Sequence, residues 1–371
     1  MIVTPPTRIR GCMMSNFWRG KRVFITGHTG FKGGWLSLWL HMMGARVSGY
    51  SLPAPTNPSL FHLARLHNCL HTTTGDVRDP LHLAHSMAAA QADVVFHLAA
   101  QALVRDSYLT PVDTYATNVM GTVHVLEAVR QTPSVRSVVV VTSDKCYENR
   151  EWLWGYREDE PMGGHDPYSS SKGVAELVTA AYRRSFFGKA GNEQVGIASV
   201  RAGNVIGGGD FAADRLIPDF IRALEKDAPV SIRNPTAVRP WQFVLEPLSG
   251  YLQIAQLLYE HGSQYAEGWN FGPAETDPKT VGQLCTTFNQ ALQQHQVAPA
   301  RVVLEPQANA PHEAHLLRLD ISKARQRLGW EPRMELSAAL ELTAQWYAGY
   351  LNNEDLRALS EEQIHFYQSL T

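Results

Sequence analysis

The sequence has few of the features that tie a chain to a metal, a membrane or a nucleic acid. Its four cysteines, Cys12, Cys69, Cys146 and Cys285, include no C-x-x-C spacing, so we expect neither a disulfide framework nor a metal site. No apolar run is long enough to cross a membrane. A net charge of −2 provides no overall attraction for nucleic acid or membrane surfaces, and neither is expected as a partner.

The chain does have enough length and apolar content for a large core. Its 371 residues, 44% hydrophobic and 18% charged, are typical of a globular protein of two to three domain-sized units. Residues 1–18 carry basic side chains but no apolar core, so they do not have the pattern of a signal peptide. We therefore expect a disordered leader over 1–18 and a cytoplasmic location.

Short β-branched runs alternate with helical patterns in the first half of the chain. The expected strands and helices alternate along 21–27, 35–44, 45–52, 80–91, 93–100, 114–131, 137–143 and 168–187. The runs at 93–100 and 137–143 show almost no alternation of polar and apolar residues, which is typical of a parallel sheet covered on both faces. The order predicts an α/β protein with a Rossmann-type doubly wound parallel sheet.

Further along, glycine, proline and arginine gather in loops and the strands become short. This change predicts a smaller, mixed α/β domain that binds a substrate over the carboxyl ends of the sheet. We expect a dinucleotide-binding domain over 19–200 and a substrate domain mainly over 201–355. Segments around 240–272 are expected to return to the first domain, and 356–371 to form a C-terminal tail.

A glycine loop, GHTGFKG, follows the first expected strand. Gly27, Gly30 and Gly33 permit a tight turn and a close approach of the backbone to a pyrophosphate, while the next helix offers amide donors at its N-terminus. The second expected strand ends at Ser51 and Leu52 with neither an acid nor an arginine to choose between NAD and NADP. The loop therefore predicts a dinucleotide and leaves its type open.

A second motif, YSSSK, predicts the oxidation of an alcohol. Tyr168 and Lys172 are four residues apart on an expected helix, so they share one face. An adjacent ammonium lowers the pKa of a tyrosine from its usual value of about 10, and the phenolate then acts as a base. Ser143 ends a strand and is expected to bond the same hydroxyl. Asp144 and Lys145 add acid and base groups that a simple alcohol dehydrogenase does not need.

Together with HLAAQ at 97–101 and LDISKARQRLGWEP at 319–332, these motifs resemble the extended short-chain dehydrogenase/reductase family, over roughly residues 19–350. That family modifies sugars attached to nucleoside diphosphates. Four separate stretches, GHTGFKGGW, TSDKCYEN, RAGNVIGGGD and RPWQFVLEPL, resemble the 4,6-dehydratases that act on CDP-glucose. The resemblance implies NAD as cofactor, a homodimer or homotetramer, and a place in deoxysugar biosynthesis such as that of lipopolysaccharide O-antigen.

The resemblance also implies a lyase that converts CDP-D-glucose to CDP-4-dehydro-6-deoxy-D-glucose and water. Tyr168 would take the proton of the C4 hydroxyl, and Asp144 would protonate the leaving C6 hydroxyl. Lys145 stands where related dTDP-glucose dehydratases carry a glutamate, and it is the candidate base at C5. Because lysine is a base only when it is neutral, a second role stays open, in which a charged Lys145 stabilises the enolate.

The expected contacts follow from the same motifs, with arginine forks on the two phosphates of the substrate. Residues expected to contact the cofactor are Gly27, Thr29, Gly30, Phe31, Lys32, Gly33, Asp76, Val77, Leu98, Ala99, Ala100, Gln101, Asn118, Tyr168 and Lys172. Residues expected to contact the substrate are Gln101, Ser143, Asn204, Arg215, Leu216, Ile217, Arg233, Arg239, His312 and Glu313.

Three other interpretations stay open. A nucleotide-sugar 4-epimerase would use Ser143, Tyr168, Lys172 and NAD without the acid and base pair. A 4,6-dehydratase acting on another nucleotide sugar would use the whole set, because the residues alone do not select cytosine. A non-catalytic NAD-binding protein is a third possibility, disfavoured by the intact serine, tyrosine and lysine.

Overall fold

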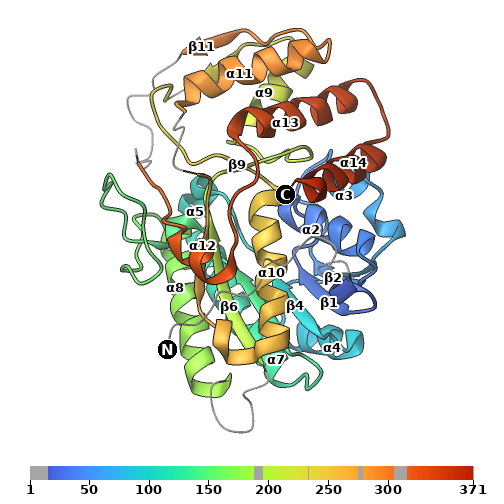
Figure 1. Cartoon of the computed structure of the whole chain (residues 1–371), viewed down its shortest axis with the longest axis vertical. Coiled ribbons are helices and arrows are strands. Elements are labelled where there is room, and N and C mark those ends of the chain that lie inside the picture. The colour runs from blue at the N-terminus through green and yellow to red at the C-terminus, as the bar shows by residue number, and fades with distance from the viewer. Residues whose placement is uncertain (1–15, 188–194, 233, 275–278, 305–315, 371) are drawn as a thin grey trace.

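The computed structural model of the chain describes residues 16–187, 195–232, 234–274, 279–304 and 316–370 (Figure 1). The strands are β1 (Arg22–Thr26), β2 (Arg46–Ser51), β3 (His71–Thr74), β4 (Val94–His97), β5 (Ser137–Val141), β6 (Gly196–Ala202), β7 (Val205–Ile206), β8 (Val230–Ile232), β9 (Gln242–Phe243), β10 (Gly268–Phe271) and β11 (Val302–Leu304). The α-helices are α2 (Phe31–Met42), α3 (Leu60–Leu63), α4 (Pro80–Ala90), α5 (Val104–Leu109), α6 (Pro111–Tyr115), α7 (Gly121–Arg130), α8 (Pro167–Tyr182), α9 (Leu216–Glu225), α10 (Leu245–His261), α11 (Val281–Gln294), α12 (Ser322–Leu328), α13 (Leu336–Leu351) and α14 (Leu356–Ser369). Short 3₁₀ and π turns link several of them, of which η3 (Asp144–Cys146) lies in the site described below.

Seven parallel strands form the main sheet, in the order β10-β6-β5-β4-β1-β2-β3. The chain first winds outward from β1 to β3 and then returns to β4 on the other side of β1. This reversal makes a crevice at the carboxyl ends of β1 and β4, where such sheets bind ligands. The α/β class and the doubly wound parallel sheet predicted from the sequence are confirmed.

The edge strand β3 is a strand that the sequence patterns did not predict. Its residues, His71 to Thr74, are polar and largely exposed, and it pairs only with β2. An edge strand with little to bury carries no apolar signal, so alternation and apolar runs both miss it. In contrast, β5 consists of one serine and four valines, all buried, and its continuous apolar run identified it.

A smaller set of elements gathers at one end of the molecule, around α9, α11, β11 and α13 (Figure 1). There β8 and β11 form a parallel pair, and β7 and β9 form another. The segment between these elements, with α10 and β10, belongs to the main sheet, because β10 pairs with β6 along its edge. None of the helices among the described residues has the length and apolar character needed to span a bilayer.

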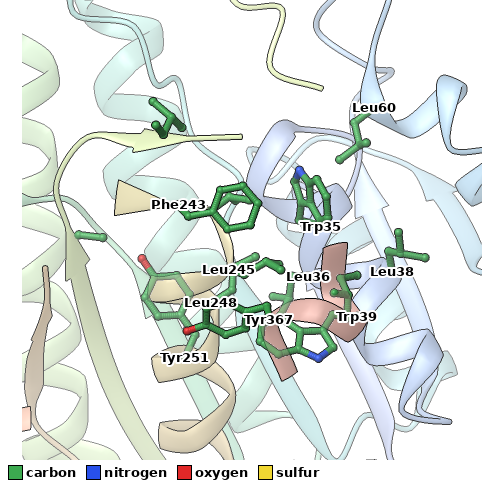
Figure 2. Close-up of a cluster of buried hydrophobic side chains, with 14 of the residues drawn as sticks. Trp35, Leu36, Leu38, Trp39, Leu60, Phe243, Leu245, Leu248, Tyr251 and Tyr367 are labelled. Atoms are coloured by element: carbon green, nitrogen blue, oxygen red, sulfur yellow. The ribbon is translucent and has the colours of Figure 1, made fainter. Parts of the chain in front are cut away.

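Part of the largest core cluster lies between α2 and α10 (Figure 2), and the same cluster continues to Phe220 of α9 and Phe288 of α11. Trp35 and Trp39 of α2 are both buried there; Trp35 donates its Nε1 hydrogen bond to the carbonyl of Gly208 at 2.9 Å. Trp39 packs edge to face against Tyr367 of α14, with ring centroids 5.6 Å apart. This packing fixes α2, and therefore the glycine loop at its N-terminus, against the rest of the domain.

Candidate active site

A pocket of about 690 Å³ opens at the carboxyl edge of the main sheet, between the sheet and the smaller set of elements. From the sheet side it is lined by Ser143, Asp144, Lys145 and Tyr168. The opposite side contributes Asn204, Arg215, Leu216, Ile217 and Arg239. The structure thus brings together residues that are up to 96 positions apart in the sequence, from 143 to 239.

Asp144 and Lys145, which the sequence predicts to be the acid and the base, lie shortly after the end of β5. Ser143 caps the short turn η3, and its hydroxyl oxygen accepts a hydrogen bond from the Lys145 amide at 3.3 Å. The same hydroxyl donates to Asp144 Oδ1 at 2.9 Å. Burial raises the pKa of Asp144, although the charge of Lys145 opposes the shift. A buried carboxyl with a raised pKa holds a proton more readily, which suits a general acid.

Tyr168 and Lys172 lie on α8, whose first turn is set by Asp166. Pro167 occupies the first helical position, and the Asp166 carboxylate accepts hydrogen bonds from the Ser169 amide at 2.8 Å and hydroxyl at 2.5 Å. Burial raises the pKa of Tyr168 to about 12, although a hydrogen bond with Ser143 opposes this rise. Ser143 therefore contacts both the tyrosine and Asp144.

Lys172 lies behind the pocket rather than in its wall. It is 6% exposed, and its Nζ donates to the carbonyl of Val141 at 3.3 Å. Burial, together with the charge of Lys32, lowers the pKa of Lys172 to about 8. Lys32 lines the pocket itself, and burial, followed by the charge of Arg215, lowers its pKa to about 8. Two ammonium groups therefore share the region around Tyr168.

The glycine loop fits a dinucleotide pyrophosphate. A Cβ on Gly33 would lie 2.1 Å from the carbonyl oxygen of Gly27, and Gly27 itself has φ +79°. A Cβ on Gly30 would meet only that oxygen, at 3.4 Å, so the space above Gly30 is open. Helix α2 begins there without a side-chain cap and without an acid in its first turn. Its first amide groups are therefore left to donate hydrogen bonds to a bound anion, and no carboxylate repels that anion. Thr29 bonds Ser51 Oγ at 2.7 Å and the Leu52 carbonyl at 3.0 Å, which closes the loop on the end of β2.

Two other expected cofactor residues, Asp76 and Val77, lie after β3. The Asp76 carboxylate pairs with Arg78 at 2.6 Å, and its carbonyl accepts from the Tyr50 hydroxyl at 3.0 Å. The Val77 carbonyl contacts His124 Nδ1 at 2.8 Å. These bonds fix the segment at the carboxyl edge of the sheet.

The segment after β4 supplies the next group, from Leu98 to Gln101. The Leu98 and Ala99 amides bond the carbonyl and hydroxyl oxygens of Thr26, at 3.1 and 3.3 Å, so this backbone lies against the end of β1. Ala100 follows in the same segment, after the end of β4. Phe31, by contrast, lines the pocket beside Lys32.

Asn118 and Gln101 are joined by reciprocal hydrogen bonds. The Gln101 amide donates to Asn118 Oδ1 at 2.9 Å, and Asn118 Nδ2 donates to the Gln101 carbonyl at 3.0 Å and to Ser171 Oγ at 2.8 Å. The Gln101 side chain bonds both backbone groups of Leu103 at 2.9 Å. Asn118 thus connects the segment after β4 to α8.

On the far wall, Arg215 pairs with Asp210 at 2.8 Å. Attraction to Asp210 raises the pKa of Arg215, so the guanidinium stays charged in the pocket wall. Arg105 and Asp214, both in the pocket wall, form a further ion pair at 3.2 Å. Sequence reasoning did not select Asp210, Asp214 or Arg105, although Asp210 ends the GGGD stretch and was visible there.

The remaining expected substrate residues divide into two groups. Asn204 uses its carbonyl to accept from the Gln242 amide at 3.0 Å, while Leu216 and Ile217 open α9. Arg233, His312 and Glu313 lie outside the described residues. Within the described part of the chain, no group of three or more histidine, cysteine, aspartate or glutamate side chains is arranged to hold a metal.

A doubly wound sheet with Ser143, Tyr168 and Lys172 at its carboxyl edge defines an enzyme of the extended short-chain dehydrogenase/reductase class. Residues 24–343 match the family model described as GDP-mannose 4,6 dehydratase. The chain is also 55% identical over 362 residues to a CDP-glucose 4,6-dehydratase of Salmonella typhimurium, covering 96% of this chain and 98% of that protein. The chain belongs to this dehydratase family.

More distant relatives and solved structures agree with the fold. A dTDP-glucose 4,6-dehydratase of Xanthomonas campestris is 26% identical, over 87% of this chain and 92% of that protein. The crystal structure of a dTDP-glucose 4,6-dehydratase from Streptomyces venezuelae with NAD bound has a TM-score of 0.72 at 22% identity, over 90% and 99% of the two chains. A UDP-glucose 4-epimerase from Thermotoga maritima gives 0.74 at 22% identity, over 89% and 99%.

Proposed function

We propose that this protein is an NAD-dependent lyase that converts CDP-D-glucose to CDP-4-dehydro-6-deoxy-D-glucose and water. The observation that carries the proposal is the pocket in which Ser143, Asp144, Lys145 and Tyr168 meet. The activity named for the Salmonella relative, at 55% identity, supports the same substrate. The glycine loop of Gly27, Gly30 and Gly33 would hold NAD, which would supply the hydride acceptor for C4 of the sugar and the hydride donor for C6.

Each residue of the site has a defined proton to move. Tyr168 takes the proton of the C4 hydroxyl while C4 becomes a ketone. Burial raises the pKa of Tyr168 to about 12, contrary to the lowering expected from the sequence, so the phenolate relies on the hydrogen bond with Ser143 and the charge of Arg215, which both lower this pKa. The ketone acidifies the C5 proton, which Lys145 removes in its neutral form. Asp144, whose pKa is raised by burial, gives a proton to the departing C6 hydroxyl, which leaves as water. The proton on Lys145 then returns to C5, so the product differs from the substrate by one water.

After this sequence Tyr168 holds one proton too many and Asp144 one too few. Ser143 contacts both, since it donates to Asp144 Oδ1 at 2.9 Å and bonds Tyr168. We assign to Ser143 the contact with the C4 oxygen, and to exchange with solvent after product release the step that restores both groups for the next turnover.

Substrate binding is assigned to the far wall of the pocket. Arg215 and Arg239 are the cations placed to meet the two phosphates, while Leu216 and Ile217 at the start of α9 cover the base. Gln101 and Asn204 are assigned to polar contacts with the sugar and ribose. The same assignment holds Arg233, His312 and Glu313 as substrate contacts on the strength of their motifs alone.

The 4-epimerase alternative requires Ser143, Tyr168 and Lys172 but no acid next to the serine. Asp144 is 4% exposed, lines the pocket and has a raised pKa. Burying a carboxyl costs free energy, and an epimerase gains nothing from it. This residue therefore favours elimination over simple epimerisation.

The test uses the purified protein with NAD and glucose joined to CDP, dTDP, UDP or GDP. We expect CDP-glucose to lose the mass of one water. Deuterium placed at C4 of the sugar is expected on the new C6 methyl group. An unchanged mass with inverted C4 would select the epimerase, loss of water from a different nucleotide would correct the base, and label in solvent would contradict the hydrogen transfer.

A homodimer is proposed as the minimal assembly, with the homotetramer and the cytoplasmic location still predictions. Exposed apolar side chains gather on α5 to α8 and the turns that join them. They are Tyr108, Leu109, Val112, Tyr115, Met120, Leu177 and Phe186. Two such surfaces, related by a two-fold axis, would cover each other. Sedimentation velocity of the wild type and of a Leu177→Glu variant tests this surface.

A further inference from the structure

A buried ion pair lies directly behind the catalytic residues. Glu176 on α8 and Arg201 on β6 join through two parallel hydrogen bonds, Nε to Oε1 and Nη2 to Oε2, each 2.8 Å long. Both side chains are only 4% exposed. Burial alone would raise the pKa of Glu176, but the charge and hydrogen bonds of Arg201 outweigh it and lower that pKa. Such a pair stays charged, and it is costly to bury without a purpose.

The first end of the catalytic segment is attached to this pair through Glu176. Residues 142–147 run from the end of β5 through Ser143, Asp144 and Lys145 to Tyr147. Thr142 donates its hydroxyl hydrogen bond to Glu176 Oε1 at 2.5 Å. The other hydroxyl that donates to this carboxylate belongs to Ser199 of β6, which bonds Glu176 Oε2 at 2.6 Å and lies outside the segment.

The second end of the segment is attached through Arg201. Its Nη1 donates to the Tyr147 hydroxyl at 2.5 Å, and the guanidinium lies 5.0 Å from the centre of that ring. Tyr147 in turn donates to Asn270 Oδ1 of β10 at 2.8 Å. One ion pair therefore holds both ends of the segment that carries the acid and the base.

The same pair also fixes this segment relative to the oxidising tyrosine. Glu176 follows Lys172 by four residues and Tyr168 by eight, so all three occupy one face of α8. The elimination needs Asp144 and Lys145 at fixed distances from the sugar that Tyr168 oxidises. Errors of about 1 Å in such placement lower rates by roughly 10²-fold.

We propose that Glu176 and Arg201 are positioning residues, which act by holding Thr142 and Tyr147 and so set the place of Ser143, Asp144 and Lys145. They touch neither substrate nor cofactor in this role. The inference rests on the proposed dehydratase function for its kinetic test, but the placement of the segment can be measured without turnover.

Glu176→Gln is the obvious variant, but it leaves the buried Arg201 without its counter-charge and threatens folding. The test therefore cuts the attachments one at a time. Thr142→Val and Tyr147→Phe each remove one hydroxyl at an end of the segment and keep the shape of the side chain. Ser199→Ala is the matched control, because it removes a hydroxyl from the same carboxylate on the side away from the segment.

With CDP-glucose and NAD, we expect each segment variant to lower kcat about tenfold, with KM within about twofold of the wild type. Ser199→Ala is expected to lower Tm by about as much as the two segment variants do, but to keep the kcat of the wild type. Thr142→Ser should restore most of the rate, because it restores the hydroxyl. Wild-type kcat in both segment variants, or an equal loss in Ser199→Ala, would overturn the inference.

Hydrogen–deuterium exchange separates this inference from the proposed function. We expect the amides of 142–147 to exchange faster in Thr142→Val and Tyr147→Phe than in the wild type and Ser199→Ala. If the wild type converts no nucleotide sugar, the proposed function is refuted while this measurement still decides the positioning role. Unchanged exchange in both segment variants refutes the positioning role in either case.

Discussion

Replacing Gly33 by alanine would place a methyl carbon 2.1 Å from the carbonyl oxygen of Gly27 and 2.8 Å from its carbonyl carbon. Ordinary contacts between such atoms are about 3.5 Å, so the turn must open by roughly 1.4 Å. Overpacking of this kind costs about 1–3 kcal/mol. We therefore expect Gly33→Ala to lower Tm by several degrees and to bind NAD weakly.

Gly30→Ala separates the effect of a methyl group on NAD binding from its effect on the stability of the fold. Gly30 has φ −79°, which alanine adopts readily, and its methyl group would meet only the Gly27 oxygen at 3.4 Å. The free protein should therefore keep its Tm. If a pyrophosphate rests on the open space above Gly30, the methyl group should weaken NAD binding by roughly tenfold, which corresponds to about 1.4 kcal/mol.

Thermal melting and isothermal titration with NAD measure both quantities on the same samples. Gly44→Ala serves as a control for glycine replacement away from the loop: φ is +80°, and the nearest atom to its Cβ would be 3.5 Å away. It should lower Tm through backbone strain and leave NAD affinity unchanged. Wild-type affinity in Gly30→Ala would show that the pyrophosphate does not rest there, and the assignment of the loop would be wrong.

Three further predictions concern titrating groups. Lys145→Met should still oxidise C4 but should not exchange C5 hydrogen with deuterated water, as read by mass spectrometry; normal exchange would assign C5 to another base. Burial, with the charge of Lys32, lowers the pKa of Lys172 to about 8, so kcat should fall above pH 8, and Lys32→Gln should move this limb to higher pH. Burial raises the pKa of Glu246 from 4.5 to about 7, so the folded state binds the proton more tightly and loses stability as pH rises from 4.5 to 7, by on the order of 3 kcal/mol. Glu246→Gln should flatten this part of the urea-unfolding profile, and an unchanged slope would contradict it.

The sequence was sufficient for the parts of the fold that have a strong local pattern. Short local patterns predict three of these parts: the run of valines in β5, the proline and Asp166 at the start of α8, and the glycine loop before α2. The polar strand β3 has no such pattern, because an edge strand is specified by its partner rather than by burial.

The same distinction applies to the site. Ser143 and Tyr168 were selected from their motifs, and the structure places them in contact. The pairing of Arg215 with Asp210 and of Arg105 with Asp214 depends on how loops meet in space. Glu176 carried a usable signal, since it continues the face of α8 that holds Tyr168 and Lys172. Its partner Arg201 carried none, because it is the only arginine in an apolar strand and its neighbours come from elsewhere in the chain.

The attachment of both ends of segment 142–147 explains why the role of Lys145 is harder to assign than that of Ser143. Because Thr142 and Tyr147 are held from α8 and β6, we expect the turn between them to keep its shape when the side chain at 145 is changed. A motif therefore reports where this residue lies but not its protonation state, which depends on the charges that surround it in the loaded pocket. Exchange at C5 reports that state through the reaction itself, and for this reason it decides between a neutral base and a charged stabiliser where the backbone geometry is the same for both.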